Sequence, residues 1–582
     1  MTFRAPVRDI AFALNVAGHG DLAKASFPDL DEATIEAVLD AAGAFATDVL
    51  APLNRIGDQQ GASHRDGKVT AAPGFAEAYR TFAQQGWNSL SADPEHGGQG
   101  LPKAMELAVF EMVHAANMAF GLCPMLTQAA IEALTLHGDE RQKRLVLPKL
   151  VSGEWTGTMN LTEPQAGTDL AALTTRAEPN GNGGYKLYGQ KIFITWGDHD
   201  AADNICHLVL ARLPDAPPGV KGISLFLATK RLVNDDGSLG EANNLWPASI
   251  EHKLGIHASP TCVMMFDGAQ AELVGEVNQG LAHMFVMMNA ARLQVGVEGV
   301  GIAERAFQQA LAYAQDRTQG KSPWTGVSPA PIFDHPDVRR TLMLMKAKIE
   351  AARGICFMTG VLADHARLAP TPEARASAKA RQELLTPIAK AWSTDMGVEV
   401  ASMGVQIHGG MGFIEETGAA QHYRDARIAP IYEGANGIQA LDLAGRKLGM
   451  ADGAVMDALC AEMAMTAEAL TERADLTEAG RRLAEGVRSL EAATDWLLAN
   501  RGTDSAAGAT PYLKLAGDVI GGFVLSRQAL AAAGSDDPWM QARLPLLRLY
   551  GGQVLAGAGG LAAAVTQGAA ELEAVDGAAL GG

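Results

Sequence analysis

The sequence predicts an α+β fold in which helical regions flank a central β region, and three observations lead to this prediction. Residues 30–150 contain segments, such as 31–53 and 103–118, in which apolar residues recur at the spacing of an amphipathic helix. Between about 155 and 275 the pattern changes to short runs rich in β-branched and aromatic residues. After Gly280 long helical patterns return and continue toward the C-terminus.

The central region is expected to form an antiparallel β domain. Its candidate strands are residues 184–188, 191–195, 207–211, 223–227 and 262–266. The segment 180–184, Asn-Gly-Asn-Gly-Gly, stands between two such runs, and its glycines supply the positive φ angles of a hairpin turn.

The helical region after Gly280 is broken by a stretch rich in Pro and Gly, 320–336, which we expect to be a loop. An Ala-rich helical region follows from residue 451, with loops expected at 502–505 and 534–538. We therefore predict four domains: an N-terminal helical domain (1–154), the β domain (155–278), a C-terminal helical bundle (279–450) and an additional C-terminal helical domain (451–582).

Composition narrows the classes of function. The chain has 582 residues, of which 48% are hydrophobic and 19% charged, as expected for a folded globular protein. Its 66 acidic and 47 basic residues give a net charge of −19, which repels phosphate backbones and argues against nucleic acid as a partner. The longest uncharged run, 549–570, is mostly Gly and Ala, so we expect no membrane span.

The five cysteines lie more than fifty residues apart, so no clustered metal-ligand spacing occurs and no metal is predicted. The spacing suits free thiols in a reducing compartment, and the N-terminus lacks an export signal. We expect a cytoplasmic protein. Sequence patterns of P-loop, zinc-protease and nucleophile-elbow enzymes are also absent.

A glycine-rich motif, Gly296-Val-Glu-Gly-Val-Gly, lies inside an apolar helical run and has no strand before it. A dinucleotide-binding loop requires that strand, so close packing between helices is the favoured interpretation.

Two other stretches are unusual. Residues 162–169, Thr-Glu-Pro-Gln-Ala-Gly-Thr-Asp, offer hydroxyls and backbone N–H groups to a phosphate, although an ordinary loop fits equally well. Residues 406–413, Gln-Ile-His-Gly-Gly-Met-Gly-Phe, precede Glu433 in Ile-Tyr-Glu-Gly. Desolvation there could raise the pKa of this carboxyl toward that of a general base, and a surface-loop glutamate is the alternative.

Taken together, these stretches resemble the acyl-CoA dehydrogenase family, flavoenzymes that desaturate thioesters between the α and β carbons. The matching features, in the order of the family, are residues 161–169, 191–195, the long helix 292–317, and 406–410 leading to 431–434. The resemblance covers about residues 35–448, and the helical, β, helical order is the fold of the family. The C-terminal extension and residues 3–9 resemble a long bacterial subgroup that includes 3-methylmercaptopropionyl-CoA dehydrogenases.

The resemblance implies that Glu433 removes the α-proton of an acyl-CoA substrate while the β-hydrogen leaves as hydride to N5 of FAD, which yields the trans-2-enoyl-CoA. It also implies that the thioester oxygen accepts hydrogen bonds from the Glu433 backbone N–H and a flavin ribityl hydroxyl, which stabilises the developing charge.

The resemblance further implies the residues that hold the cofactor. Those around the flavin ring are Met159, Leu161, Thr162, Gly167, Thr168, Phe193 and Thr195; those that hold the adenine and pyrophosphate, across a subunit boundary, are Arg317, Gln406, Gly409 and Gly410. Sharing FAD in this way implies at least a homodimer. Substrate contacts are implied for Thr168, Asn289, Arg292, Glu433 and Gly434.

Some positions depart from the pattern of the family. Phe193 stands where many relatives have Trp, Ala435 where many have Thr, Asn289 where some have Asp, and His257 where many have Arg. The FAD contact that the Thr hydroxyl makes in relatives is therefore expected to be missing at Ala435, and the CoA contacts are expected to differ from those of the family. The flavin chemistry itself requires none of these residues.

Several functional alternatives stay open at this stage. The implied electron acceptor is an electron-transfer flavoprotein, while an acyl-CoA oxidase would use O₂. The subgroup points to 3-(methylthio)propanoyl-CoA and dimethylsulfoniopropionate degradation, and fatty acid metabolism with another chain length is the alternative. A flavin-containing DNA-binding relative is disfavoured by Glu433 and by the acidic charge balance.

Overall fold

Helices and strands fall in two units of the chain. The computed structural model describes residues 3–27 and 30–581. The mixed unit contains Ala41–Gln294, and the helical unit contains Pro6–Asp40 and Val295–Gly582. The division does not follow the predicted domains, because residues 6–40 belong to the helical unit and residues 279–294 to the mixed unit. The predicted boundaries at 154, 278 and 450 stay predictions.

Helices come before the sheet, as predicted, and the first of them, α3, crosses from the helical unit into the mixed unit after Asp40. The helix expected over 31–53 consists of α3 (Glu32–Phe45), a π-helical turn (Ala46–Leu50) and the start of α4 (Ala51–Gln60), and the helix expected over 103–118 is α6 (Lys103–Ala116). The other elements here are α5 (Phe75–Gln84), α7 (Met118–His137), α8 (Glu140–Leu145), α9 (Leu147–Val151) and the hairpin β1 (Ser63–Arg65) and β2 (Lys68–Thr70).

Among the described residues, α7 alone is long and apolar enough to cross a membrane, and 83% of its apolar window is buried inside the folded chain. It packs on the sheet at Gly157, where a Cβ would lie 2.5 Å from the Cβ of Ala130. This burial is typical of the core helix of a globular unit.

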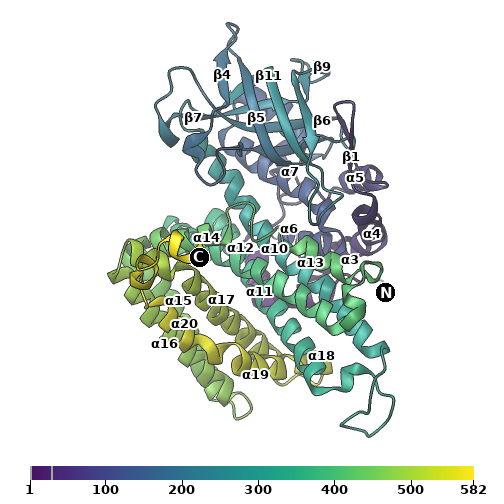
Figure 1. Cartoon of the computed structure of the whole chain (residues 1–582), viewed down its shortest axis with the longest axis vertical. Helices are drawn as coiled ribbons and strands as arrows, with labels where there is room; N and C mark the ends of the chain where they lie inside the picture. The colour runs from purple at the N-terminus through teal and green to yellow at the C-terminus, as the bar shows by residue number, and fades with distance from the viewer. Residues whose placement is uncertain (1–2, 28–29, 582) are drawn as a thin grey trace. The chain divides into compact units, whose positions relative to one another are not determined.

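The remaining strands of the mixed unit form one seven-stranded sheet (Figure 1). They are β3 (Trp155–Asn160), β4 (Arg176–Pro179), β5 (Tyr185–Thr195), β6 (Asn204–Arg212), β7 (Ile223–Thr229), β10 (Leu245–Ile250) and β11 (Thr261–Val274). A separate pair is β8 (Arg231–Val233) and β9 (Leu239–Ala242). All five predicted runs are extended, but the first two, 184–188 and 191–195, form the single strand β5, so the five runs correspond to four strands.

Most strand pairs of this sheet are antiparallel, as predicted. The expected turn joins β4 to β5, with Gly181 and Gly183 at φ of +82° and +84°. The exceptions are β6 with β3 and one register position of β6 with β4, which are parallel. The predicted antiparallel β domain thus contains a parallel edge, because the chain that leaves β3 passes through β4 and β5 before β6 begins.

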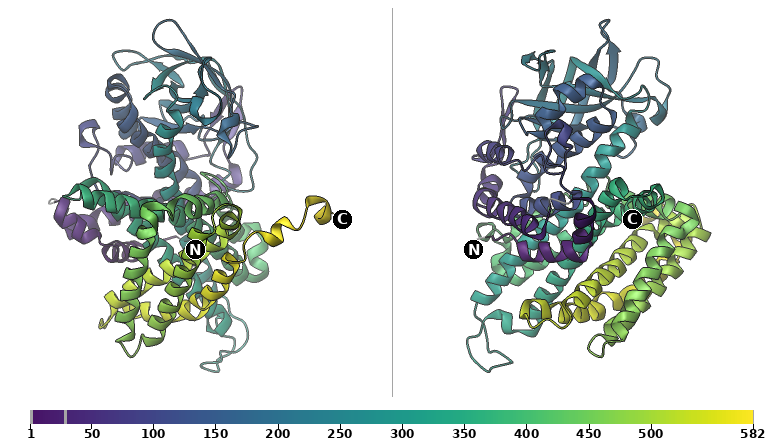
Figure 2. Two further views of the ribbon diagram at one scale, coloured as in Figure 1. Left: turned by 90° about the vertical axis from the view of Figure 1, so that its left-hand side faces the viewer. Right: turned by 180° about the vertical axis from the view of Figure 1, so that it is seen from behind.

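The helical unit is built on long helices (Figures 1 and 2). They are α10 (Gly280–Asp316), which starts in the mixed unit, α11 (Pro336–Leu368), α12 (Pro372–His408), α15 (Ala454–Thr471), α16 (Thr477–Ala499) and α17 (Thr503–Ala532). Shorter helices are α1 (Val7–Val16), α2 (His19–Ser26), α13 (Ala419–Ala426), α14 (Asn436–Asp442), α18 (Pro538–Gln541), α19 (Arg543–Gln553), α20 (Ala558–Val565), α21 (Ala570–Glu573) and α22 (Gly577–Gly581). The run 549–570 is thus divided between α19 and α20.

The glycines of the 296–301 motif serve helix packing, as the sequence predicts. A Cβ on Gly296 would lie 2.6 Å from the carbonyl oxygen of Ala389, and one on Gly299 would lie 2.4 Å from that of Ser393. These clashes show that α10 and α12 approach more closely there than any larger residue allows.

The N-terminal helix α1 is tied to helices far along the chain by a buried ionic network. The carboxylate of Asp9 accepts from Lys346 on α11 at 2.9 Å and from Arg543 on α19 at 2.6 Å. Burial alone would raise the pKa of Asp9, but Lys346, Arg353 and Arg543 hold it well below its usual value. Helix α1 is therefore an integral part of the helical unit.

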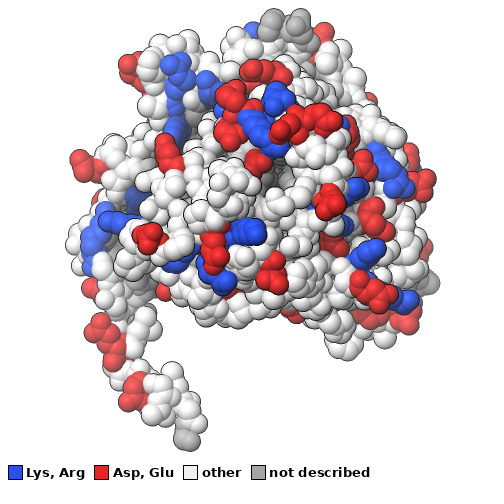
Figure 3. Space-filling model, turned by 90° about the horizontal axis from the view of Figure 1, so that it is seen from above, with Lys and Arg blue, Asp and Glu red and all other residues white. Residues whose placement is uncertain are grey.

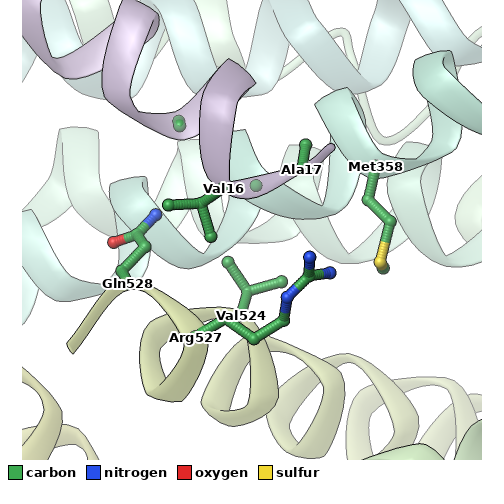
Figure 4. A pocket seen from close by; sticks show the side chains of 8 residues that line it. Val16, Ala17, Met358, Val524, Arg527 and Gln528 are labelled. Carbon is green, nitrogen blue, oxygen red and sulfur yellow. The ribbon is translucent and has the colours of Figure 1, made fainter. Parts of the chain in front are cut away.

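A small cavity of about 10 Å³ lies where α1, α11 and α17 meet. Figure 4 shows Val16 and Ala17 on one side and Met358, Val524, Arg527 and Gln528 on the others. It has room for about one water molecule and none for a flavin or an acyl chain.

On the face shown in Figure 3, Lys and Arg side chains lie among Asp and Glu rather than in one continuous basic area. This face therefore shows no continuous positively charged surface, and the chain as a whole has a net charge of −19.

Candidate active site

The predicted site residues are divided between the two units. The mixed unit holds Met159, Leu161, Thr162, Gly167, Thr168, Phe193, Thr195, Asn289 and Arg292, and the helical unit holds Arg317, Gln406, Gly409, Gly410, Glu433 and Gly434. Each group has its own local geometry.

In the mixed unit, the loop 161–169 follows β3 and is held by a buried ion pair. Glu163 accepts from the Lys191 ammonium at 2.8 Å, and both side chains are at most 2% exposed. The backbone N–H of Thr174 and the hydroxyl of Thr175 also donate to this carboxylate, at 2.7 and 2.6 Å. Lys191 in turn donates to the Leu161 carbonyl at 2.9 Å. The loop is therefore fixed at its start.

The environment of Glu163 favours its ionised form. Burial by itself would raise its pKa, but the Lys191 ammonium and the hydrogen bonds from Thr174 and Thr175 lower the pKa of Glu163 to about 2. Sequence reasoning did not assign this pair a role. The available signal was a lysine inside the apolar strand Lys191-Ile-Phe-Ile-Thr and a glutamate in a nearby loop.

Phe193 lies at an irregularity of β5. The register against β11 shifts between Cys262 and Met264, and Phe193 has a φ of +60° although it is not glycine. The neighbouring Ile192 N–H donates to the Thr162 carbonyl at 2.9 Å, which joins this bulge to the loop 161–169. The Phe193 side chain is 58% exposed. An aromatic ring kept in solvent by a strained backbone is typical of a binding residue.

The other predicted residues of the mixed unit differ in exposure. Met159 is buried, Leu161, Thr162 and Thr195 are half-buried, and Gly167 and Thr168 are exposed. Asn289 is exposed, whereas Arg292 is 7% exposed and donates to the Asn289 side chain at 3.1 Å. His257, a departure from the family pattern, contacts the Asp58 and Lys253 carbonyl oxygens.

In the helical unit, Glu433 lies on a tight turn. Glu433 has a φ of +54° and Gly434 a φ of +87°, so two successive residues are left-handed. This conformation is unfavourable for a glutamate and is found mostly where function requires it. The side chain of Glu433 is half-buried.

The chain on both sides of this turn is anchored. The Lys390 ammonium on α12 donates to the Ala429 carbonyl at 2.8 Å and to the Asn436 side chain at 2.9 Å. The backbone N–H of Asn436 donates to Pro430 at 3.0 Å, which closes the turn. The strained backbone of Glu433 is thus held by contacts on either side of it.

A second carboxyl group lies close to this turn. Glu298 on α10 is fully buried, and the Tyr432 hydroxyl donates to its Oε2. Burial and, to a smaller extent, the charge of Glu433 raise the pKa of Glu298 to about 8, while the Tyr432 hydrogen bond and Lys390 oppose the rise. Glu298 was missed as a candidate, although a glutamate within Gly-Val-Glu-Gly-Val is unusual for an apolar helix.

The predicted nucleotide-binding residues of the helical unit lie at two helix ends. Arg317 follows the end of α10, and Gln406 lies in the last turn of α12, before Gly409 at a φ of +60°. Tyr313 and His408 stack at 4.5 Å and bring these ends together. Arg317, Gln406, Gly409 and Gly410 are all exposed.

Each unit, taken by itself, has features that suit part of a nucleotide cofactor. A Cβ added at Gly167, Gly409 or Gly410 would meet no atom within 4 Å, which leaves room beside the backbone at each. In the helical unit, Arg317 offers a cation at the end of α10, which the Tyr313–His408 stack joins to the end of α12 beside Gly409. In the mixed unit, Phe193 offers an exposed aromatic face. No group of His, Cys, Asp and Glu suited to a metal occurs within 3–27 and 30–581.

Sequence models of known families match four consecutive parts of the chain. The acyl-CoA dehydrogenase N-terminal, middle and C-terminal domains match residues 32–154, 158–269 and 278–448. The domain described as acetyl-CoA dehydrogenase C-terminal like matches residues 459–576.

Curated relatives agree with these matches. The chain is 47% identical to 3-methylmercaptopropionyl-CoA dehydrogenase of Ruegeria pomeroyi, over 95% of this chain and 96% of that protein. It is 37% identical to a butyryl-CoA dehydrogenase of Syntrophomonas wolfei, over 72% and 70%. Its identity to the broad-specificity linear acyl-CoA dehydrogenase FadE5 of Mycobacterium tuberculosis is 32%, over 92% and 91%.

Solved structures share the fold. Caenorhabditis elegans ACDH-11 in complex with C11-CoA superposes with a TM-score of 0.78 at 22% identity, covering 95% of this chain and 92% of that one. Acyl-CoA dehydrogenase from Bacillus anthracis, complexed with FAD, gives 0.74 at 21% identity, covering 95% and 90%.

Proposed function

The chain belongs to the acyl-CoA dehydrogenase family and is an FAD-dependent oxidoreductase that dehydrogenates acyl-CoA thioesters, and we propose that Glu433 is its catalytic base. The observation that supports this role is the paired left-handed conformation of Glu433 and Gly434 in a turn anchored from both sides. Such a turn keeps the carboxylate in one place, as a general base requires.

The residues of the chain divide the reaction between them. The Glu433 carboxylate takes the α-proton of the thioester, and its backbone N–H polarises the thioester oxygen. FAD, when bound, supplies the acceptor for the β-hydrogen as hydride. The half-buried position of Glu433 limits the water that competes for the proton.

Two sets of residues would hold FAD. Met159, Leu161, Thr162, Gly167, Thr168, Phe193 and Thr195 would surround the flavin ring, and Arg317, Gln406, Gly409 and Gly410 would hold the adenine and pyrophosphate from the neighbouring subunit. Exposed apolar side chains follow Gly410, with Met411, Phe413 and Ile414 at 50%, 86% and 44% exposure. They support a homodimer that covers this surface.

We further propose 3-methylmercaptopropionyl-CoA as the substrate, which would place the enzyme in dimethylsulfoniopropionate degradation. The support is the 47% identity over nearly the whole length to the Ruegeria pomeroyi enzyme of that name. Asn289, Arg292, Thr168 and Gly434, with Glu433, would contact the acyl-CoA. An electron-transfer flavoprotein is the proposed electron acceptor, and the five buried free cysteines suit the cytoplasm.

The base is tested by Glu433→Gln. The variant should purify yellow, with FAD bound as in the wild type, because the amide keeps the size of the side chain. Acyl-CoA should fail to bleach the flavin, with the rate of reduction lower by about 10³-fold or more. Near-normal bleaching, followed at 450 nm without oxygen, would exclude Glu433 as the base.

The substrate is tested by a panel of thioesters. Turnover of 3-methylmercaptopropionyl-CoA should exceed that of straight-chain acyl-CoAs of four to twelve carbons in kcat/KM. A clear preference for a straight chain would refute the substrate proposal.

The electron acceptor is tested by reoxidation of the reduced enzyme. Reoxidation should be faster with an electron-transfer flavoprotein than in air, and the reverse order would indicate an oxidase.

A further inference from the structure

Glu298 is a carboxyl group in an apolar setting. It lies on α10 between Val297 and Val300, which are fully buried, as is Glu298 itself. A carboxyl group in such a place is costly unless it is neutral or paired. The turn of α10 around it packs through Gly296, Gly299 and valines, so Glu298 calls for a purpose other than packing.

The described contacts of Glu298 lead to the catalytic turn. The Tyr432 hydroxyl donates to Oε2, whereas Oε1 finds no hydrogen-bond partner within the described residues. Tyr432 directly precedes Glu433, so a fixed Tyr432 side chain limits the rotation of the backbone that carries Glu433. The unfavourable φ of +54° at Glu433 needs such support.

We propose that Glu298 is a positioning residue for the reaction, which acts by holding the Tyr432 hydroxyl and thereby the left-handed backbone of Glu433. The inference rests on the proposed role of Glu433 as base. In this role Tyr432 restrains the backbone of Glu433, and Glu298 does not touch the reacting atoms.

The charge state of Glu298 matters because two carboxyl groups share this region. The charged groups that face Glu298 are Glu433 and Lys390, and Tyr432 is the titratable group in contact with it. With a pKa raised to about 8, mainly by burial, Glu298 is neutral at pH 7 and leaves Glu433 as the ionised member of the pair. Above that pH a second negative charge would disfavour the ionised form of Glu433 and slow proton removal.

The raised pKa of Glu298 also makes the stability of the folded chain depend on pH. The folded state holds the proton of Glu298 up to about pH 8, whereas an unfolded glutamate loses it near its ordinary value of 4.5. Stability from this group is therefore full below about pH 4.5 and is lost as the pH rises toward 8. Glutamine at this position does not ionise, so the stability of the Glu298→Gln variant should not fall for this reason as the pH rises.

The test compares Glu298→Gln, Glu298→Leu and Tyr432→Phe by anaerobic flavin reduction with the panel substrate that turns over best. Glu298→Gln still accepts the Tyr432 hydroxyl, so its rate at pH 7 should stay within about 3-fold of the wild type. Glu298→Leu and Tyr432→Phe should each slow reduction by about 10-fold, with KM little changed and FAD content normal. The double variant should be no slower than Glu298→Leu, because both changes remove one contact.

The pH profile separates this role from a purely structural one. The wild-type rate should fall above about pH 8, and Glu298→Gln should lack that fall and should gain melting temperature relative to the wild type at pH 9. The matched control is Glu304→Gln, which changes another buried glutamate of α10 whose partner is Arg353 and should leave the pH profile unaltered. A normal rate in Glu298→Leu, or an alkaline fall that persists in Glu298→Gln, would overturn the proposal.

The two proposals fail in distinguishable ways. Reduction that persists in Glu433→Gln removes the base, whatever the Glu298 variants do. An inactive Glu433→Gln together with a fully active Glu298→Leu removes only the positioning role.

Discussion

Each unit fixes its part of the candidate site with a buried glutamate, but the two glutamates are held in opposite ways. In the mixed unit, Glu163 is ionised and receives hydrogen bonds from Lys191, Thr174 and Thr175. In the helical unit, Glu298 is neutral at pH 7 and receives one hydrogen bond, from Tyr432. A buried carboxyl group that receives several hydrogen bonds can stay ionised, whereas one that receives a single hydrogen bond is more stable when protonated.

The difference suits what each loop contributes. The loop 161–169 presents backbone and hydroxyl groups, and a saturated ion pair behind it adds rigidity without adding charge. The turn at Glu433 carries the carboxylate that must stay ionised, so a neutral neighbour is required. An ionised Glu298 would compete with Glu433 for the proton.

The largest expected effect comes from breaking the ion pair. Lys191→Met leaves the Glu163 carboxylate buried without its cation, which should cost about 3–5 kcal/mol of stability in the mixed unit. Hydrogen exchange of β5 and FAD retention after gel filtration would measure the loss. The matched control is Lys186→Met, because Lys186 is an exposed lysine of the same strand, and it should change stability by less than about 0.5 kcal/mol. If both variants behave alike, Glu163 does not depend on Lys191.

Acid should remove the stabilisation that Glu163 provides but not that of Glu298. The pKa of Glu163 falls from 4.5 to about 2, so its stabilisation is present above about pH 4.5 and is lost as the pH drops toward 2. The loss should reach about 2 kcal/mol by pH 3 in the mixed unit, while Glu298 stays protonated over that range and contributes none of it. Hydrogen exchange of β5, compared between the wild type and Glu163→Gln from pH 5 to 3, would measure it, and the variant should lose this acid dependence. Equal acid sensitivity in that variant would contradict the assignment.

Much of this organisation is predictable from local sequence. Apolar spacing predicts α6 and the strands β5, β6, β7 and β11, because burial of one face imposes a period on neighbouring residues. The glycine pair in 180–184 predicts its hairpin, since only the backbone of the turn is involved. The motif around Glu433 is likewise contiguous in the chain.

The contacts that support the site join distant residues and carry no local signal. Lys191 and Glu163 meet only once β5 lies beside the loop after β3, and Glu298 and Tyr432 are separated by 134 positions. The parallel pairing of β3 with β6 is of the same kind. Each depends on how elements pack, which the period of a single element does not reveal.

The smallest expected effect concerns Glu298, the neutral buried glutamate of the helical unit. Tyr432→Phe removes one hydrogen bond to a neutral carboxyl group, so at pH 7 it should destabilise the helical unit by only about 1 kcal/mol. At pH 9 the same change should cost more, because Glu298 is then ionised and loses its only described donor. The control is Tyr423→Phe, at a tyrosine of α13 that is 42% exposed, whose cost should be near zero at both pH values. A cost for Tyr432→Phe that is already several kcal/mol at pH 7, and does not grow with pH, would mean that Glu298 is ionised like Glu163 and that the two units do not differ.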